Sequence, residues 1–358
     1  MNAQFTRHEL IFKQASGTSR GVLTTKETYL LEISKNGQKG IGECAIFRGL
    51  SYDDVPDYEE KLTWLCENIH LDFEVLKKEL LHYPSIIFGL EQALLNLEHG
   101  EDLYFPSDFT DGKDSIKING LIWMGNADFM QSQIEEKLAK GFDCIKLKIG
   151  VDWKSEKEII KKLREKFPKE QLELRVDANG AFSYEEARMV LQELADLGIH
   201  SIEQPIKKSE VRSPKSEENS EKNSTDCSAP WIEMAKLCAE TPTPIALDEE
   251  LIGVIDFEEK KKLLETIKPQ YIILKPALVG GFSGSDEWIV LAESLGIDWW
   301  ITSALESNIG LNAICQYTYT KKNPLPQGLG TGALFTNNFE THLQLEGDQM
   351  WHKKTPYC

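Results

Sequence analysis

Beyond its first third, the chain alternates regularly between short apolar segments and longer amphipathic ones. Residues 145–149 are apolar apart from two lysines and predict a buried strand, and 155–167 follow with the apolar spacing of a helix. The same pair recurs at 172–176 and 184–197. Continued to the end, the alternation gives eight strand–helix units, of which the last is reduced to about 328–332.

Eight consecutive units of this kind close naturally into a TIM-like (β/α)-barrel, here over 115–332. A doubly wound open sheet is the alternative fold. It places a glycine-rich phosphate-binding turn after its first strand, and the sequence has none there. The expected fold class is therefore α/β, a (β/α)-barrel with a smaller unit in front of it.

Residues 1–114 have a different order of elements, with strands first and helices after, which is typical of an α+β domain. The predicted elements are, in order, strands over 5–14 and 20–34, a hairpin turn at Asn36-Gly37, a third strand over 40–45, and helical segments over 53–81 and 85–97.

Charge and cysteine content narrow the class of protein. A net charge of −18 over 358 residues opposes binding to nucleic acid and to anionic membrane surfaces, so a small anionic substrate would need a local cationic site. The seven cysteines contain no Cys-x-x-Cys pair, which is typical of reduced thiols in the cytoplasm. Neither a signal peptide nor an apolar run of membrane-spanning length is predicted.

One segment, residues 207–229, breaks the alternation after the fourth barrel strand. It consists mainly of Ser, Lys, Glu and Asn, so it cannot bury enough apolar surface to offset the entropy of ordering it. We expect a disordered surface insertion, with a regulatory segment as the alternative.

Two lysines stand one residue apart in the strand predicted around 144–150. Lys146 and Lys148 share a face of this strand, because alternate side chains point the same way. Two neighbouring ammonium groups lower each other's pKa, and a lysine with a lowered pKa can act as a base near neutral pH. A solvent-facing edge strand with two solubilising lysines is the alternative for this pair taken alone.

Acidic residues follow three consecutive strands of the predicted barrel. Asp177, Glu203 and Asp248 stand at the carboxyl ends of the third, fourth and fifth strands, where barrel enzymes place their chemistry. Taken singly, an acid at such a position is often only a helix cap. Three crowded carboxylates repel one another, and a hard divalent ion with oxygen ligands, Mg²⁺, removes that repulsion.

Lys275 follows the sixth strand, so amines flank the acids on both sides. Lys146 and Lys148 precede the acids around the barrel, and Lys275 comes after them. A substrate carboxylate near the ion would present its α-carbon between Lys148 and Lys275. The pattern predicts abstraction of the proton α to a carboxylate, which gives an enediolate whose charge the ion stabilises.

Six short motifs of the barrel, KLK, VDANGAF, IEQP, ALDEE, LKP and SALES, resemble in order those of the muconate-lactonizing branch of the enolase superfamily. The resemblance extends over the barrel and the unit before it. It implies that 1–114 is a capping domain, and 333–358 is expected to return to that domain.

The resemblance also implies individual roles. The Mg²⁺ ligands would be the three acids, with Mn²⁺ able to substitute for Mg²⁺. Lys148 would be the acid/base, Lys146 the partner that tunes its pKa, and Lys275 the lysine on the opposite face of the substrate.

Within that branch the chain resembles the o-succinylbenzoate synthases of menaquinone biosynthesis. This implies syn elimination of water from a 2-succinyl-6-hydroxy-cyclohexadiene-1-carboxylate, giving 2-succinylbenzoate through an enediolate. The stretches 301–310 and 328–332 resemble the loops that hold the succinyl end, and imply Ser303, Ser307 and Gly330 as substrate-binding residues. Two departures from the family pattern are the polar insertion and the sequence GLGTG at 328–332, where an acidic residue is usual.

Two alternatives stay open at this stage. A dipeptide epimerase or N-acylamino acid racemase of the same branch would also use a lysine on each side of its substrate. Epimerases commonly carry Asp-x-Asp near the eighth strand to bind an ammonium group, whereas this chain has Thr331 and glycines there. A non-catalytic barrel that binds an anionic metabolite is the alternative from another class.

The remaining candidates have two interpretations each. Arg175 contacts substrate or Lys148, or forms a structural ion pair. Asn179 orients a metal-bound water or caps the next helix. Glu249 positions the metal ligands without itself binding the metal, or its negative charge stabilises the first turn of a helix. Arg48 is a specificity candidate in the loop that would cover the barrel mouth. His99, His200 and His342 show no ligand spacing and are expected to be structural.

Overall fold

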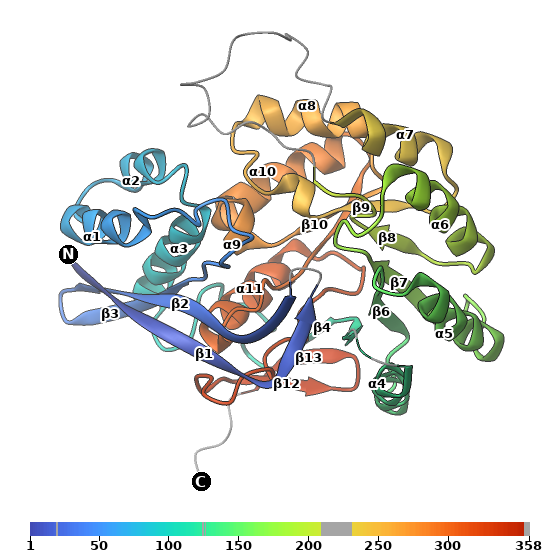
Figure 1. Ribbon diagram of the computed structural model, residues 1–358. Coiled ribbons are helices and arrows are strands. Elements are labelled where there is room, and N and C mark those ends of the chain that lie inside the picture. The colour runs from blue at the N-terminus through green and yellow to red at the C-terminus, as the bar shows by residue number, and fades with distance from the viewer. Residues whose placement is uncertain (19–20, 124, 126, 209–230, 354–358) are drawn as a thin grey trace, which may run out of the picture.

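The structure is a computed structural model that describes residues 1–18, 21–123, 125, 127–208 and 231–353 (Figure 1). Its N-terminal unit is an antiparallel sheet of order β1-β2-β3 with three helices packed on it. The elements are β1 Asn2–Thr18, β2 Gly21–Lys35, β3 Gln38–Cys44, α1 Tyr58–Asn68, α2 Phe73–Glu79 and α3 Pro84–His99.

Helix α3 lies unusually close to β3. A Cβ atom on Gly42 would lie 2.0 Å from the carbonyl oxygen of Gly89, so only glycine at position 42 permits this approach. The single helical segment predicted over 53–81 is wrong in one respect. The chain turns at 69–72 and forms two helices, α1 and α2, because Leu71 N–H bonds back to Asn68 O and Asp72 adopts an extended conformation before α2.

A parallel seven-stranded sheet forms the second unit and confirms the predicted α/β barrel class. Its order, β11-β10-β9-β8-β7-β6-β5, follows the chain strand by strand. The strands are β5 Gly120–Ile122, β6 Cys144–Lys148, β7 Glu173–Asp177, β8 Ser201–Glu203, β9 Ile245–Leu247, β10 Tyr271–Leu274 and β11 Asp298–Ile301.

Residues 327 and 328 close the barrel between its two edge strands. Gly328 forms a parallel bridge to Thr302, which follows β11, and Gln327 forms one to Ile118, which precedes β5. The Gln327 side chain adds a further bond, since its Oε1 accepts from Ile301 N at 2.8 Å. The predicted eighth repeat is thus present as a two-residue strand.

Helices cover the outside of the barrel, as Figure 1 shows. Their apolar faces pack on the strands and form one large core with them. Helix α6 shows how local sequence determines where a helix begins, because Ser183 and Glu186 form a complete capping box at its N-terminus. The helices are α4 Ala127–Ala139, α5 Trp153–Lys166, α6 Tyr184–Asp196, α7 Ile232–Glu240, α8 Phe257–Ile267, α9 Pro276–Val279, α10 Gly281–Ser294 and α11 Asn308–Lys321.

The C-terminal segment contacts both units. Leu334 O accepts from Lys13 N of β1 at 2.8 Å, so this part lies beside the N-terminal sheet. The following hairpin, β12 Leu343–Glu346 and β13 Gln349–His352, pairs instead with β4 Ser115–Lys117 at the start of the barrel unit. The division into domains at 114 and 332 stays a prediction.

The remaining expectations concern the polar insertion, membrane-spanning helices, the cysteines and the cellular location. The insertion predicted over 207–229 lies outside the described residues except for its first two, Lys207 and Lys208. Among the described residues, no helix is long and apolar enough to cross a membrane. The five described cysteines are free thiols. The cytoplasmic location stays a prediction.

Candidate active site

A cavity of about 100 Å³ lies at the carboxyl ends of the barrel strands. All three predicted lysines and Asp177 line it. Phe47 and Leu50 line it from the loop after β3, so the N-terminal unit covers the barrel mouth. A wider cleft of about 610 Å³ shares Leu50, Asn179 and Glu249 with this cavity and continues it outward.

The pairing of the central strands brings the first two acids and both strand lysines together. Asp177 of β7 is the register partner of Lys148 on one side and of Glu203 on the other. Lys148 Nζ lies 2.9 Å from Asp177 Oδ2. Lys146 Nζ lies 2.7 Å from Glu203 Oε2 and 3.4 Å from Asp177 Oδ2. The alternative of a solvent-facing edge strand is therefore excluded for this lysine pair.

The third acid and the third lysine complete the row. Lys275 Nζ contacts Asp248 Oδ2 and lies 4.0 Å from Glu203 Oε1. The side chains of all three acids are only 2% exposed. Ammonium and carboxylate groups thus alternate across the barrel mouth, and each buried charge has a neighbour of opposite sign.

The pKa of Lys146 is not lowered in the manner expected. Burial lowers the pKa of Lys146, but Glu203 and Asp177 act in the opposite direction, and the net pKa is raised above its ordinary value. The expectation considered only the second lysine and omitted the two carboxylates that Lys146 faces. A lowered lysine pKa requires that another cation engage these carboxylates.

The carboxylates themselves differ in protonation preference. Burial raises the pKa of Asp177, but Lys148, Lys146 and Lys275 outweigh it and hold that pKa well below its usual range. Burial dominates at Asp248, where the pKa is raised despite Lys275.

The donor atoms of the three acids suit a hard divalent cation. They offer only carboxylate oxygens, which are the ligands that Mg²⁺ prefers. Glu203 Oε1 is buried and receives no hydrogen bond from any residue that the structure describes. Such an atom retains the full cost of desolvation unless a cation approaches it. The assignment of Asp177, Glu203 and Asp248 as metal ligands stays a proposal.

Asn179 and Glu249 lie beside Lys148. Lys148 Nζ donates to Asn179 Oδ1 at 2.5 Å, and Asn179 Nδ2 donates to Glu249 Oε1 at 3.1 Å. Asn179 adopts a left-handed conformation with φ of 44°, which Asn tolerates better than most residues. Asn179 therefore contacts Lys148 directly, which neither interpretation drawn from the sequence anticipated.

Two of the three predicted loop residues line the cavity. Ser303 and Gly330 belong to its wall, and Ser303 Oγ forms a 2.6 Å hydrogen bond with Thr331 Oγ1. Ser307 is fully buried and caps α11 instead, with its Oγ accepting from Ile309 N.

Glu43 of β3 accounts for the position of Ser307. Its carboxylate accepts from Ser307 Oγ at 2.5 Å, from Ser307 N at 3.0 Å and from Gly310 N at 2.9 Å. An acid from the N-terminal unit thus satisfies the free amides at the start of α11. The substrate-binding prediction for Ser307 finds no support in these contacts, which favour a structural role.

The first barrel strand contributes wall residues that the sequence analysis did not single out. Asn119, Leu121 and Trp123 line the cavity, and they stand two residues apart along the strand. Alternate residues of a strand share a face, so this period of two is a signal that could have found them.

Arg175 lies below the acids and away from the cavity wall. Its Nε donates to Glu173 Oε1 at 2.7 Å and its Nη1 to Pro326 O at 2.9 Å. The guanidinium carbon stands 4.2 Å from the ring centre of Trp300. These contacts favour the ion-pair interpretation over substrate binding.

We therefore expect Arg175→Ala to act on stability. The variant should lower the free energy of unfolding by about 3 kcal/mol, since it leaves a cavity over Trp300 and removes the partner of Glu173. Urea unfolding measures this, with the exposed Arg188→Ala as the matched control. An unchanged stability with a raised substrate KM would instead restore the substrate-binding role.

The other sequence candidates lie outside the cavity. Arg48 donates to Glu27 and to Asp54, so its guanidinium is engaged within the N-terminal unit. His200 contacts the ring of Tyr271, which agrees with a structural role. His342 lies in a group with Asp102 and His352 that is described below.

Comparison with known proteins agrees with this geometry. The family model "Enolase C-terminal domain-like" matches residues 130–216. An o-succinylbenzoate synthase from Desulfotalea psychrophila is 42% identical over 97% of this chain and 98% of its own length. The chain belongs to the o-succinylbenzoate synthase family. It is therefore an enzyme of the enolase superfamily, and the non-catalytic alternative is set aside.

Solved structures extend the relation to the whole fold. The crystal structure of MenC from Desulfotalea psychrophila superposes with a TM-score of 0.83 at 40% identity, covering 98% of this chain and 99% of that one. The L-Ala-D/L-Glu epimerase of Bacillus subtilis superposes with a TM-score of 0.80 at 20% identity over 98% and 96% of the two chains, which shows the shared fold alone. An N-succinylamino acid racemase from Thermus thermophilus is 29% identical over 84% of this chain and 78% of its own length.

Proposed function

We propose that this member of the o-succinylbenzoate synthase family eliminates water from a 2-succinyl-6-hydroxy-cyclohexadiene-1-carboxylate and releases 2-succinylbenzoate. The observation that carries the proposal is the row of alternating charges at the barrel mouth, with Lys148 and Lys275 at its two ends. A 42% identical relative of almost equal length supports the choice of substrate.

Lys148 performs both proton transfers. As a neutral amine it takes the proton from the carbon α to the ring carboxylate, and the electrons of that C–H bond form an enediolate. The enediolate then expels the hydroxyl group from the same face, and the Lys148 ammonium returns the proton, so water leaves and the ring becomes aromatic. Asn179 holds the Lys148 Nζ through its Oδ1 and so directs the amine toward the substrate.

Lys275 stabilises charge from the opposite side. Its ammonium group faces the substrate ring across from Lys148 and favours the enediolate electrostatically and through the ring face. Asp248 contacts Lys275 Nζ and holds it in place.

The three acids, Asp177, Glu203 and Asp248, would hold the Mg²⁺ ion that enolase superfamily enzymes generally use. When bound, the ion supplies positive charge beside the substrate carboxylate, where negative charge develops during proton abstraction.

The succinyl end of the substrate is expected on the other wall of the cavity. Ser303 and Thr331 present hydroxyl groups there, and Gly330 leaves space because it has no side chain. These hydroxyl groups can donate hydrogen bonds to the keto and carboxylate oxygens of a succinyl group, and they offer no negative charge to a substrate ammonium group.

An assay panel tests the assignment of substrate. Purified protein should convert the cyclohexadiene carboxylate in the presence of Mg²⁺ and lose that activity in excess chelator. Dipeptides should show no exchange of their α-proton. Exchange of dipeptides without dehydration would assign an epimerase instead.

Racemisation of N-succinylamino acids is the second candidate function. The 29% identical racemase from Thermus thermophilus favours it, as does the presence of a lysine on each side of the cavity. In the same panel this activity requires both lysines, because each enantiomer offers its proton to a different face. Lys275→Ala should therefore abolish racemisation.

A further inference from the structure

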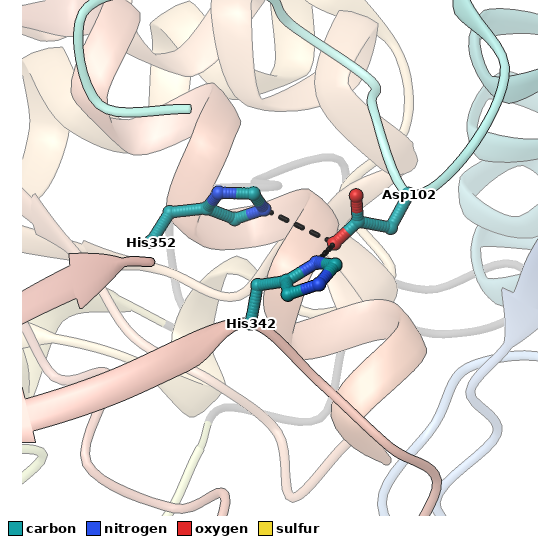
Figure 2. A group of neighbouring side chains, drawn as sticks. All are labelled: Asp102, His342 and His352. Carbon is teal, nitrogen blue, oxygen red and sulfur yellow. Dashed lines mark hydrogen bonds and ion pairs between the residues drawn. The ribbon is translucent and has the colours of Figure 1, made fainter. Parts of the chain in front are cut away.

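A second group of potential metal ligands lies far from the acids of the barrel mouth. It consists of Asp102, which follows α3, and of His342 and His352 from the C-terminal segment (Figure 2). The hairpin that carries His352 pairs with β4, which precedes the first barrel strand. The group therefore belongs to the amino ends of the strands, whereas the catalytic cavity lies at their carboxyl ends.

One carboxylate oxygen joins the two imidazoles. His342 Nδ1 lies 2.6 Å and His352 Nε2 3.1 Å from Asp102 Oδ2 (Figure 2). His352 is fully buried, and His342 and Asp102 are about one-third exposed. The three ligand atoms lie within 4.8 Å of one another. An ion could therefore reach the group from the solvent beside His342, while His352 lies at the buried end of the site.

The positions of these side chains are fixed by the surrounding backbone. Asp102 O accepts from Asn312 Nδ2 at 2.9 Å and from Gln316 Nε2 at 2.8 Å, so α11 holds the loop that carries Asp102. His352 is opposite Leu343 in the β12–β13 register, and Lys353 N donates to His342 O at 2.8 Å. The site is thus assembled before any ligand binds, which lowers the entropic cost of binding.

Hydrogen bonding inside the group leaves one charged atom unsatisfied. Asp102 Oδ1 is buried, and no residue that the structure describes donates a hydrogen bond to it. The imidazoles hold Asp102 in its ionised form, since their hydrogen bonds lower its pKa to about 2 despite burial. A buried carboxylate with an unpaired oxygen beside two imidazoles is a site with remaining affinity for a cation.

The ligand types select the class of ion. Imidazole and carboxylate together suit zinc-type transition metals, whereas Mg²⁺ prefers oxygen ligands alone. Tetrahedral ligands at about 2.1 Å from zinc lie about 3.4 Å apart, so the contacts of Asp102 Oδ2 with His342 Nδ1 and His352 Nε2, at 2.6 and 3.1 Å, need to lengthen by less than about 1 Å. His342 can make this movement because it is partly exposed.

We propose that Asp102, His342 and His352 bind one zinc-type divalent ion, which fastens the β12–β13 hairpin to the segment that follows α3. The ion takes the place of the hydrogen that each imidazole shares with Asp102, and each neutral ring then carries its hydrogen on its other nitrogen. Water completes the coordination of the ion. The ion bridges residues 240 or more positions apart in the chain, and it acts on the stability of the fold.

Zinc titration of the metal-free full-length protein tests the proposal. In calorimetry at pH 7.5 with excess Mg²⁺ present, the wild type should bind one Zn²⁺, and a 100-fold excess over Kd should raise Tm by about 3 °C. His342→Ala and Asp102→Asn should each weaken binding at least about 100-fold and abolish the Tm shift. Co²⁺ in place of Zn²⁺ should give the visible absorption of tetrahedral coordination.

Two controls separate this site from other sources of binding. His99→Ala removes an exposed imidazole close in sequence to Asp102 and should leave zinc binding unchanged. Asp177→Asn disturbs the catalytic carboxylates and should also leave it unchanged. The proposal is overturned if the wild type binds no Zn²⁺, or if folded His342→Ala and Asp102→Asn proteins bind it as tightly as the wild type.

Discussion

The Lys148→Ala variant is expected to dehydrate its substrate about 10²–10⁴-fold more slowly than the wild type. The amine of Lys148 is the group that both takes the α-proton and returns it to the departing hydroxide, so its loss leaves neither transfer with a partner. The measurement is kcat for formation of the aromatic product, followed by its ultraviolet absorption at saturating Mg²⁺.

A matched control distinguishes this effect from a general loss of positive charge. Lys161→Ala removes an exposed lysine on the outer face of α5 and should leave kcat unchanged. Circular dichroism checks that both variants fold. A Lys148→Ala protein that keeps more than about a tenth of the wild-type kcat would exclude Lys148 as the base.

The Asp177→Asn variant is expected to bind Mg²⁺ at least about 100-fold more weakly than the wild type. Its carboxylate is buried and held ionised by three lysines, so it offers a full negative charge that the amide lacks. The dependence of kcat on Mg²⁺ concentration and calorimetric titration both report this affinity.

Asp102→Asn serves as the matched control for the magnesium experiment, because it makes the same chemical change at the opposite end of the barrel. Its Mg²⁺ affinity should equal that of the wild type. Equal Mg²⁺ binding by wild type and Asp177→Asn would remove Asp177 from the set of metal ligands.

Local periodicity made most of the barrel predictable. The strand predicted over 172–176 and the helix predicted over 184–197 agree within one residue with β7 Glu173–Asp177 and α6 Tyr184–Asp196, since each apolar pattern ends at a clear boundary. The C-terminal hairpin was not predicted, because β12 is mostly exposed and carries little apolar signal. The last strand was predicted over about 328–332 but lies at 327–328, because its extent depends on pairing with residues distant in the chain.

The barrel also explains why the positions of the acids and lysines were predictable. The carboxyl ends of neighbouring parallel strands meet at one mouth, so strand order alone brings Asp177 and Glu203 together. Arg175 shows the limit of this argument. It shares a face with Asp177 but stands two residues earlier, roughly 6.6 Å deeper in the barrel, where it pairs with Glu173.

Side-chain partners from other units could not be predicted. The pKa of Lys146 depends on two carboxylates contributed by other strands of the barrel. The sequence analysis therefore predicted a lowered pKa, whereas the pKa is raised. Ser307 carries the expected hydroxyl group, but Glu43 of the N-terminal unit engages it. Nothing in the sequence around Ser307 indicates that an acid 264 positions away would bind there.

The two-residue strand that closes the barrel determines where the sequence can change without disturbing the acids and lysines. Gly328 is part of the cavity wall. The backbone pairing is shortest there, so only a few hydrogen bonds of Gln327 and Gly328 hold this side of the pocket in place. Changes of loop length or sequence just beyond it would alter the shape offered to the substrate while leaving the acids and lysines of the other strands undisturbed. We therefore expect relatives of this enzyme that accept different substrates to differ mainly at residues 327–328 and in the loop that follows.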